Sequence, residues 1–93
     1  MRVGVLQVRL LVRGSTSLKE KRKVILSVKD RLRSRFNCAV AETEDLDNRQ
    51  LATLGIAAVS NESAHLQSML GKILDFVRAC PYAEVVGTEM EIF

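Results

Sequence analysis

The chain has 93 residues, of which 47% are hydrophobic and 27% are charged, a balance typical of one small globular domain covering residues 1–93. The sequence predicts neither a membrane span nor a signal peptide, because no apolar run approaches roughly 18 residues and arginines interrupt the N-terminal apolar run. With only two cysteines, the chain is expected to reside in the cytoplasm with both thiols free.

The net charge of +3 conceals a strong asymmetry between the two parts of the chain. Residues 1–36 carry eleven Lys/Arg and two Asp/Glu, a balance of +9, whereas residues 37–93 carry three Lys/Arg and nine Asp/Glu, a balance of −6. Two interpretations are open: the basic part serves an electrostatic role toward a partner, or the two parts neutralise each other in the fold.

Residues 3–13 predict the first strand, because apolar residues alternate along them with a period of two. The residues Gly14-Ser15-Thr16 are expected to form the turn that follows. The face of this strand that we expect to be buried carries Gly4, Leu6, Val8, Leu10 and Val12.

Residues 17–36 predict a long amphipathic helix with a basic outer side. Ser17 and Glu20 have the spacing of a capping box, in which each side chain accepts a hydrogen bond from the backbone N–H of the other residue. Leu26 lies alone in the middle of the basic side. The inner arc expected to face the core consists of Leu18, Val24, Ile25, Val28, Leu32 and Phe36.

The remainder of the chain predicts strands at 38–44 and 51–59, a helix at 62–80 and a last strand at 83–93. We expect Ser60-Asn61 to cap the second helix and Pro81 to end it. The buried face of that helix should carry Leu66, Met69, Leu70, Ile73, Phe76 and Val77.

This β-α-β-β-α-β order predicts an α+β, ferredoxin-like fold. Right-handed crossovers then give a four-stranded antiparallel sheet with both helices on one face and the strand order 4-1-3-2. The last strand would lie beside the first, which brings Arg9 and Arg13 opposite Glu89 and Glu91 and absorbs part of the charge asymmetry.

The segments GVLQVRLLVRGSTSLKEKR, RLRSRFNCAVAE and LGIAAVSN, with the terminal EMEI, resemble the YlxP-like family of short bacterial proteins. The most specific parts are SLKEKR at Ser17 to Arg22 and RFN at Arg35 to Asn37. The resemblance covers nearly the whole chain. It implies a ferredoxin-like fold and a cytoplasmic protein with a role near RNA or the ribosome, and it carries no catalytic residues because the family's function is unknown.

The residues themselves present no catalytic constellation, so we expect a non-catalytic protein without cofactor or metal. The chain lacks a P-loop, a GxGxxG turn and a nucleophile elbow, and the lone His65 lacks the further ligands that a metal needs. Cys38 and Cys80 have no CxxC spacing and are expected to be buried apolar thiols. The acidic segment from Glu42 to Asp47 leaves a cation site open, although a solvated loop is the favoured interpretation.

Two basic features predict contact with phosphate. The Gly14–Ser17 turn opens a helix and, with Lys19 and Lys21, presents amides, hydroxyls and ammonium groups to an anion, although Glu20 already complements the helix dipole there. The outer arc of the same helix carries a row suited to RNA phosphates without sequence readout, although a solvated helix face is the alternative. The candidate anion- or nucleic-acid-binding residues are Lys19, Lys21, Arg22, Lys23, Lys29 and Arg33.

Base stacking on the sheet is disfavoured, because the first and third strands contain no aromatic residue. The rival hypothesis is a protein-interaction module, a homodimer or a docking site for another protein, that uses an uncovered sheet face. The sequence leaves open which face that is, and the strand residues proposed for it depend on the assumed alternation. The interface candidates are Leu26, Val5, Ala41, Ala57 and Val59.

Overall fold

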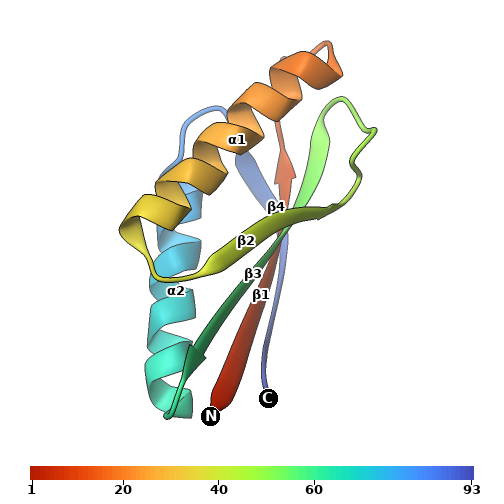
Figure 1. The fold of residues 1–93 in the computed structure, drawn as a ribbon. Helices are drawn as coiled ribbons and strands as arrows, with labels where there is room; N and C mark the ends of the chain where they lie inside the picture. The colour runs from red at the N-terminus through yellow and green to blue at the C-terminus, as the bar shows by residue number, and fades with distance from the viewer.

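The computed structural model describes all residues 1–93, and its elements follow the predicted order β-α-β-β-α-β (Figure 1). Neither helix is long and apolar enough to cross a membrane. The elements are β1 (Arg2–Leu11), α1 (Leu18–Arg35), β2 (Ala39–Glu44), β3 (Leu51–Ser60), α2 (Ser63–Ala79) and β4 (Glu84–Ile92).

The four strands form one antiparallel sheet in the order β2-β3-β1-β4, with β1 and β3 in the centre. Both helices lie on the same side of this sheet, as Figure 1 shows, and the other side is left uncovered. The predicted α+β, ferredoxin-like arrangement with strand order 4-1-3-2 is therefore confirmed.

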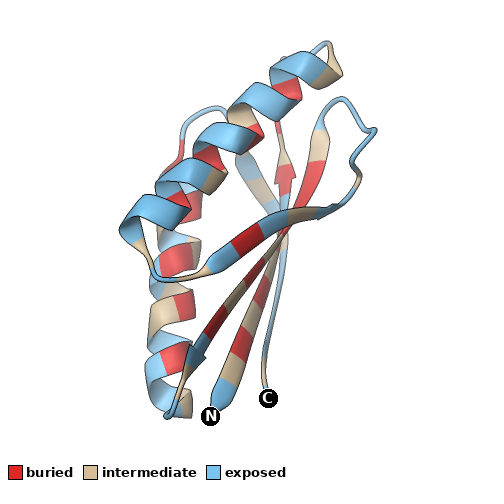
Figure 2. Ribbon diagram, viewed as in Figure 1, coloured by how far each residue is buried: buried red, intermediate tan, exposed pale blue.

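The core lies between the two helices and the sheet face that they cover (Figure 2). Alternation along β1 buries Gly4, Leu6, Val8 and Leu10 on this face, as the period-two pattern predicts. Every second residue of β3 contributes in the same way. The helices complete the core with Ile25, Val28 and Leu32 from α1 and with Leu66, Leu70, Ile73 and Val77 from α2.

The start of α1 forms a variant of the predicted capping box. The Ser17 hydroxyl accepts a hydrogen bond from the Glu20 backbone N–H at 3.1 Å, as expected. The Glu20 carboxylate, however, accepts from the backbone N–H of Thr16 at 2.9 Å, one residue before the position that a standard box would use. At the other end of α1, the Phe36 ring meets Phe76 of α2 edge-on at 5.7 Å and joins the helix to its neighbour.

The cap of α2 differs from the prediction. Its N-cap residue is Glu62, which makes no side-chain capping bond. The Ser60 hydroxyl instead accepts from the Glu62 backbone N–H at 3.2 Å, so Ser60 orders the turn before the helix and caps no helical amide.

The predicted charge pairing across β1 and β4 is wrong in register. Arg9 lies opposite Gly87, and Glu89 lies opposite Gln7. A register shift between Arg9 and Leu10 then places Glu84 near the end of β1, where its carboxylate accepts a hydrogen bond from the Arg13 Nε at 2.7 Å.

Candidate functional site

Lys21 is completely buried, although its neighbours in the sequence are exposed. It projects from the inner face of α1 in line with Ile25, Val28 and Leu32. The ammonium donates to Glu42 Oε2 at 3.0 Å and to three backbone carbonyls, those of Asp45 at 2.8 Å, Leu51 at 3.0 Å and Leu46 at 3.4 Å.

This burial removes Lys21 from the predicted phosphate-binding set. A cation with no exposed surface and four acceptors cannot contact a partner in the folded protein. Lys21 instead ties α1 to the segment from Asp45 to Gln50 that connects β2 and β3. The spacing of Lys21, Ile25 and Val28 at i, i+4 and i+7 is the sequence signal that places it on the inner face.

The outer face of α1 keeps a set of exposed cations that no carboxylate neutralises. Lys19, Arg22 and Lys23 are exposed and form no ion pair within the chain. The half-buried Lys29 is also unpaired, and Leu26 lies among these residues with 52% of its surface exposed. We call the residues Lys19, Arg22, Lys23, Leu26 and Lys29 the basic face of α1.

Arg33 belongs to this row by sequence but is partly committed to the fold. One end of its guanidinium lies 3.6 Å from the Asp30 carboxylate, and the other donates to the Val40 carbonyl at 3.0 Å. Because that carbonyl is in β2, Arg33 helps to hold α1 against the sheet edge.

The N-terminus of α1, which the sequence predicts as an anion site, already binds the carboxylate of Glu20 from the same chain. The Glu20 carboxylate lies 2.9 Å from the Thr16 backbone N–H and 3.2 Å from its hydroxyl. The Ser15 side chain donates to the Ser17 carbonyl and is buried. The turn is thus satisfied internally, and among the lysines predicted for it only Lys19 remains at the surface.

The uncovered sheet face divides into an apolar half and a polar half. The apolar half contains all four predicted strand candidates, Val5, Ala41, Ala57 and Val59, so the assumed alternation is confirmed. In the register, Val5 lies opposite Ala57, and Ala57 lies opposite Ala39. Val59 is the most prominent of them, with 62% of its surface exposed.

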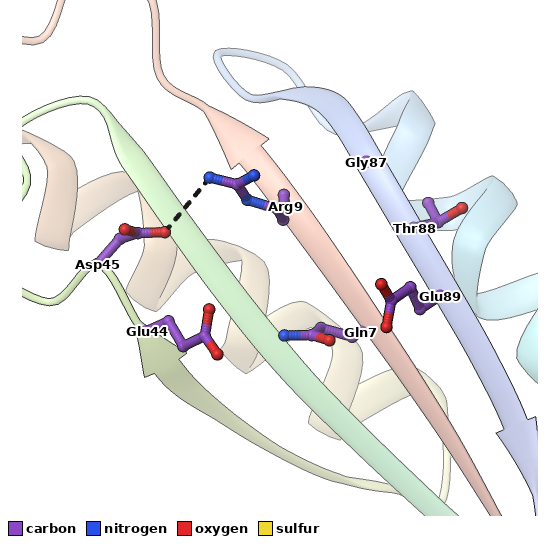
Figure 3. Close-up of a pocket in the computed structure, with 7 residues that line it drawn as sticks. All are labelled: Gln7, Arg9, Glu44, Asp45, Gly87, Thr88 and Glu89. Atoms are coloured by element: carbon purple, nitrogen blue, oxygen red, sulfur yellow. Dashed lines mark ion pairs between the residues drawn. The ribbon is translucent and has the colours of Figure 1, made fainter.

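The polar half forms a shallow depression of about 540 Å³ on the side of the sheet away from the helices (Figure 3). Arg9 and Asp45 approach one another across it, with 3.8 Å between Nη2 and Oδ2. Glu44 and Glu89 flank this pair, so carboxylates outnumber cations there. An acidic depression whose one arginine already has a carboxylate partner does not suit a phosphate.

Asp45 is held in an unusual backbone conformation at the rim of this depression. Its φ of 62° lies in the left-handed region, which aspartate tolerates better than most residues. Its carboxylate accepts from the buried Thr53 hydroxyl at 3.0 Å, while its carbonyl accepts from Lys21. The structure brings no three carboxylate, thiol or imidazole groups of the chain together as ligands for a metal ion.

In the folded protein, ion pairs neutralise part of the charge asymmetry of the sequence, and the rest separates onto two different surfaces. Three ion pairs join the basic and acidic parts of the chain: Arg9–Asp45, Arg13–Glu84 and Lys21–Glu42. The unpaired cations collect on α1. Glu89 and Glu91 lie opposite Gln7 and Val5 on the uncovered sheet face, so the two surfaces carry opposite charge.

The two cysteines and the histidine, which lie outside these surfaces, do not come together as a metal-binding cluster. Cys80 is buried, as predicted, and its Sγ lies 3.4 Å from the Phe76 carbonyl. Cys38 is only half-buried. Burial raises the pKa of the Cys38 thiol above its ordinary value, and the positive charge of Arg33 offsets part of that rise. His65 is exposed on α2 and belongs to no cluster of three groups that could hold a metal ion.

Comparison with known proteins places these features in a family and a fold class. The model of the family described as "Protein of unknown function (DUF503)" matches residues 3–90. The chain is 31% identical over 91 residues to the "Uncharacterized protein YlxP" of Bacillus subtilis, covering 98% of this chain and 99% of that one. A solved structure, the "De novo designed protein Foldit4", aligns with all of this chain and 97% of its own at a TM-score of 0.54. At 14% identity this likeness concerns the fold alone.

Proposed function

Since the chain belongs to the DUF503 family of YlxP-like proteins, whose function is unknown, we propose a role from the structure itself: a non-catalytic RNA-binding protein. The basic face of α1 would contact the phosphates of structured RNA, such as the RNA of a ribosomal surface. On this proposal the protein works in the cytoplasm as an accessory to larger RNA assemblies.

One observation carries the proposal: the cations of α1 remain exposed and unpaired after the fold has used others internally. Lys19, Arg22 and Lys23 project from a rigid helix held to the core along its opposite side. Exposed cations that no carboxylate of the chain neutralises favour phosphate contact that depends on charge and not on base sequence.

Charge reversal on the basic face tests the proposal. The variant Lys19→Glu/Arg22→Glu/Lys29→Glu avoids Arg33, whose bond to Val40 is structural, and Lys21, which is buried. Binding of an RNA hairpin should weaken, and the slope of log affinity against log salt should become less negative by about two to three units, since each of the three lost phosphate contacts contributes roughly 0.7 to 0.9.

A matched variant shows whether a loss of RNA affinity comes from the basic face of α1 or only from the lower net charge. Arg49→Glu/Lys72→Glu/Arg78→Glu reverses the three basic residues outside residues 1–36, all exposed and all free of ion pairs. It lowers the net charge by as much as the α1 variant does, but it should lose less affinity for the RNA hairpin. Equal losses in both variants, or no detectable binding by the natural sequence at low salt, would refute the proposal.

A second candidate function is self-association through the apolar half of the uncovered sheet face. The observation that favours it is the exposure of Val59 beside Val5, Ala57 and Ala41 on a surface that no helix covers. Light scattering at micromolar concentration tests it. A dimer that Val59→Glu converts to a monomer would support this function, whereas a monomer at every concentration would exclude it.

A further inference from the structure

Tyr82 is an exposed aromatic residue in a conformation that tyrosine rarely adopts. It follows Pro81 in the connection between α2 and β4, and its backbone φ is 68°. In a type II turn, where proline is common at the second position, the third position takes such an angle and normally holds glycine or asparagine. The ring gains little from burial in return, because 81% of the residue's surface is exposed.

A bulky residue held in the left-handed region without compensating burial is a recognised sign of a functional position. Tyr82 lines a cleft of about 320 Å³ together with residues of α1 and of the end of α2. Val24, Val28 and Cys80 form its apolar floor, and Pro81 lies next to the ring. Tyr82 also lines a smaller depression of about 150 Å³ that extends to Gly14.

Two cations line the same cleft. Lys23 and Arg31 project from α1, and neither forms an ion pair within the chain. Lys23 also belongs to the basic face of α1, so the cleft continues that surface around the helix. The cleft therefore combines an aromatic ring, apolar side chains and two positive charges that have no carboxylate partner in the chain.

We propose that the cleft between Tyr82 and α1 binds one unstacked nucleotide of a single-stranded RNA segment. The base stacks on the Tyr82 ring, and Lys23 and Arg31 contact the phosphates on either side of it. Aromatic stacking combined with a positively charged track is the general means of binding single strands without sequence readout. This inference rests on the proposed function. It adds to it that a single-stranded segment, continuous with the structured RNA on the basic face of α1, enters the cleft.

Charge complementarity favours RNA over a protein partner here. The cleft contributes two cations and no carboxylate, whereas Val28 and Cys80 in its lining are almost fully buried and offer little of the apolar surface on which a protein interface depends. The acidic depression on the opposite side of the sheet has the reverse balance and no aromatic residue.

Two RNAs and two variants test the inference. The RNAs are a blunt-ended hairpin and the same hairpin with a short single-stranded adenosine extension. The protein should bind the extended hairpin more tightly by about five- to a hundred-fold, the range that stacking of one base contributes. Tyr82→Asn, which suits the left-handed backbone, should abolish this difference, and Tyr82→Phe should keep it.

The single tyrosine gives a direct readout. Since the chain contains one Tyr and no Trp, its ultraviolet emission reports on Tyr82 alone. The extended hairpin should quench that emission and the blunt hairpin should not. N-acetyltyrosinamide in the same RNA solutions corrects for absorption by the bases.

The outcomes distinguish this inference from the proposed function. If neither hairpin binds at low salt, the role of α1 in RNA binding is wrong and the cleft proposal falls with it. If both hairpins bind equally and neither quenches Tyr82, the basic face stands but the cleft proposal is overturned. If adenosine monophosphate quenches Tyr82 at concentrations as low as the extended hairpin does, the cleft is a mononucleotide site and the strand proposal is wrong.

Discussion

Lys21 and Glu42 form a buried ion pair, with 3.0 Å between Nζ and Oε2, that joins the first turns of α1 to β2. The side chain of Lys21 is 0% exposed and that of Glu42 is 10% exposed. The carbonyls of Asp45 and Leu51 complete the coordination of the ammonium, so the pair also fixes both ends of the β2–β3 connection.

Lys21→Met should therefore destabilise the protein by about 3–5 kcal/mol, because it leaves a buried carboxylate and several carbonyls without a donor. For a domain of this size that is a large fraction of a total of about 5–15 kcal/mol. Urea unfolding measures the loss. Lys19→Met, two residues away and exposed, should change the stability by less than about 0.5 kcal/mol.

The double variant Lys21→Met/Glu42→Leu identifies the source of the loss. If the unpaired carboxylate is the main cost, the double variant should be more stable than Lys21→Met alone, since replacing both charges removes the buried anion. Equal stability of the two variants would assign the cost to the backbone carbonyls of the connection.

The sequence predicts the fold almost completely but misassigns Lys21, and the reason is physical. Alternation and helical periodicity are local patterns, and they suffice for all six elements and for the buried faces of β1, α1 and α2. The same periodicity places Lys21 on the inner face of α1, but its charge favours an exposed position. The acceptors that reverse this preference lie 21 to 30 residues further along the chain, where no local pattern reports them.

Removal of the α1 cap gives the second prediction. Ser17→Ala should cost about 1 kcal/mol, because the Glu20 backbone N–H loses its acceptor at the helix start. Ser27→Ala, in the exposed middle of the same helix, should be neutral or slightly stabilising, since alanine is the better helix former. Thermal or urea unfolding of the two variants measures the difference. Similar losses in both would show that the hydroxyl of Ser17 does not cap α1.

The raised pKa of Cys38 gives a prediction about pH. Because the folded state favours the neutral thiol, this group stabilises the fold fully below the ordinary thiol pKa of 9.0, and the contribution is lost as the pH rises through the higher folded pKa. Alkylation of Cys38 by iodoacetamide, followed by peptide mass spectrometry, should have a midpoint above that of the unfolded chain. Arg33→Gln should move the midpoint higher still, because it removes the charge that favours the thiolate. A midpoint that falls or stays constant would contradict this account.

The candidate surfaces were less predictable than the fold. Spacing along α1 indicates the exposure of Lys19, Arg22 and Lys23, but it cannot reveal that Arg33 donates to Val40 in a neighbouring element. The Arg9–Glu89 pairing is wrong because the β1–β4 ladder sets Glu89 opposite Gln7, two residues from Arg9, and alternation along a strand does not determine the register with its neighbour. Tyr82 carries no local signal beyond the preceding proline, since its backbone angle depends on how the chain passes from α2 into β4.

The conformation of Tyr82 gives the last prediction, which concerns stability and not binding. Tyr82→Asn should stabilise the protein by about 1 kcal/mol, because asparagine accepts the left-handed backbone that costs a tyrosine roughly 1–2 kcal/mol. Little packing is lost, since 81% of Tyr82 is exposed. Tyr82→Ala provides the matched control: it also removes the ring but suffers the same backbone penalty, so its stability should stay near that of the natural sequence or fall below it. Urea unfolding of the three proteins distinguishes the effects. If the Asn and Ala variants unfold at the same urea concentration, the backbone at Tyr82 is not strained, and its conformation does not mark Tyr82 as a stacking residue.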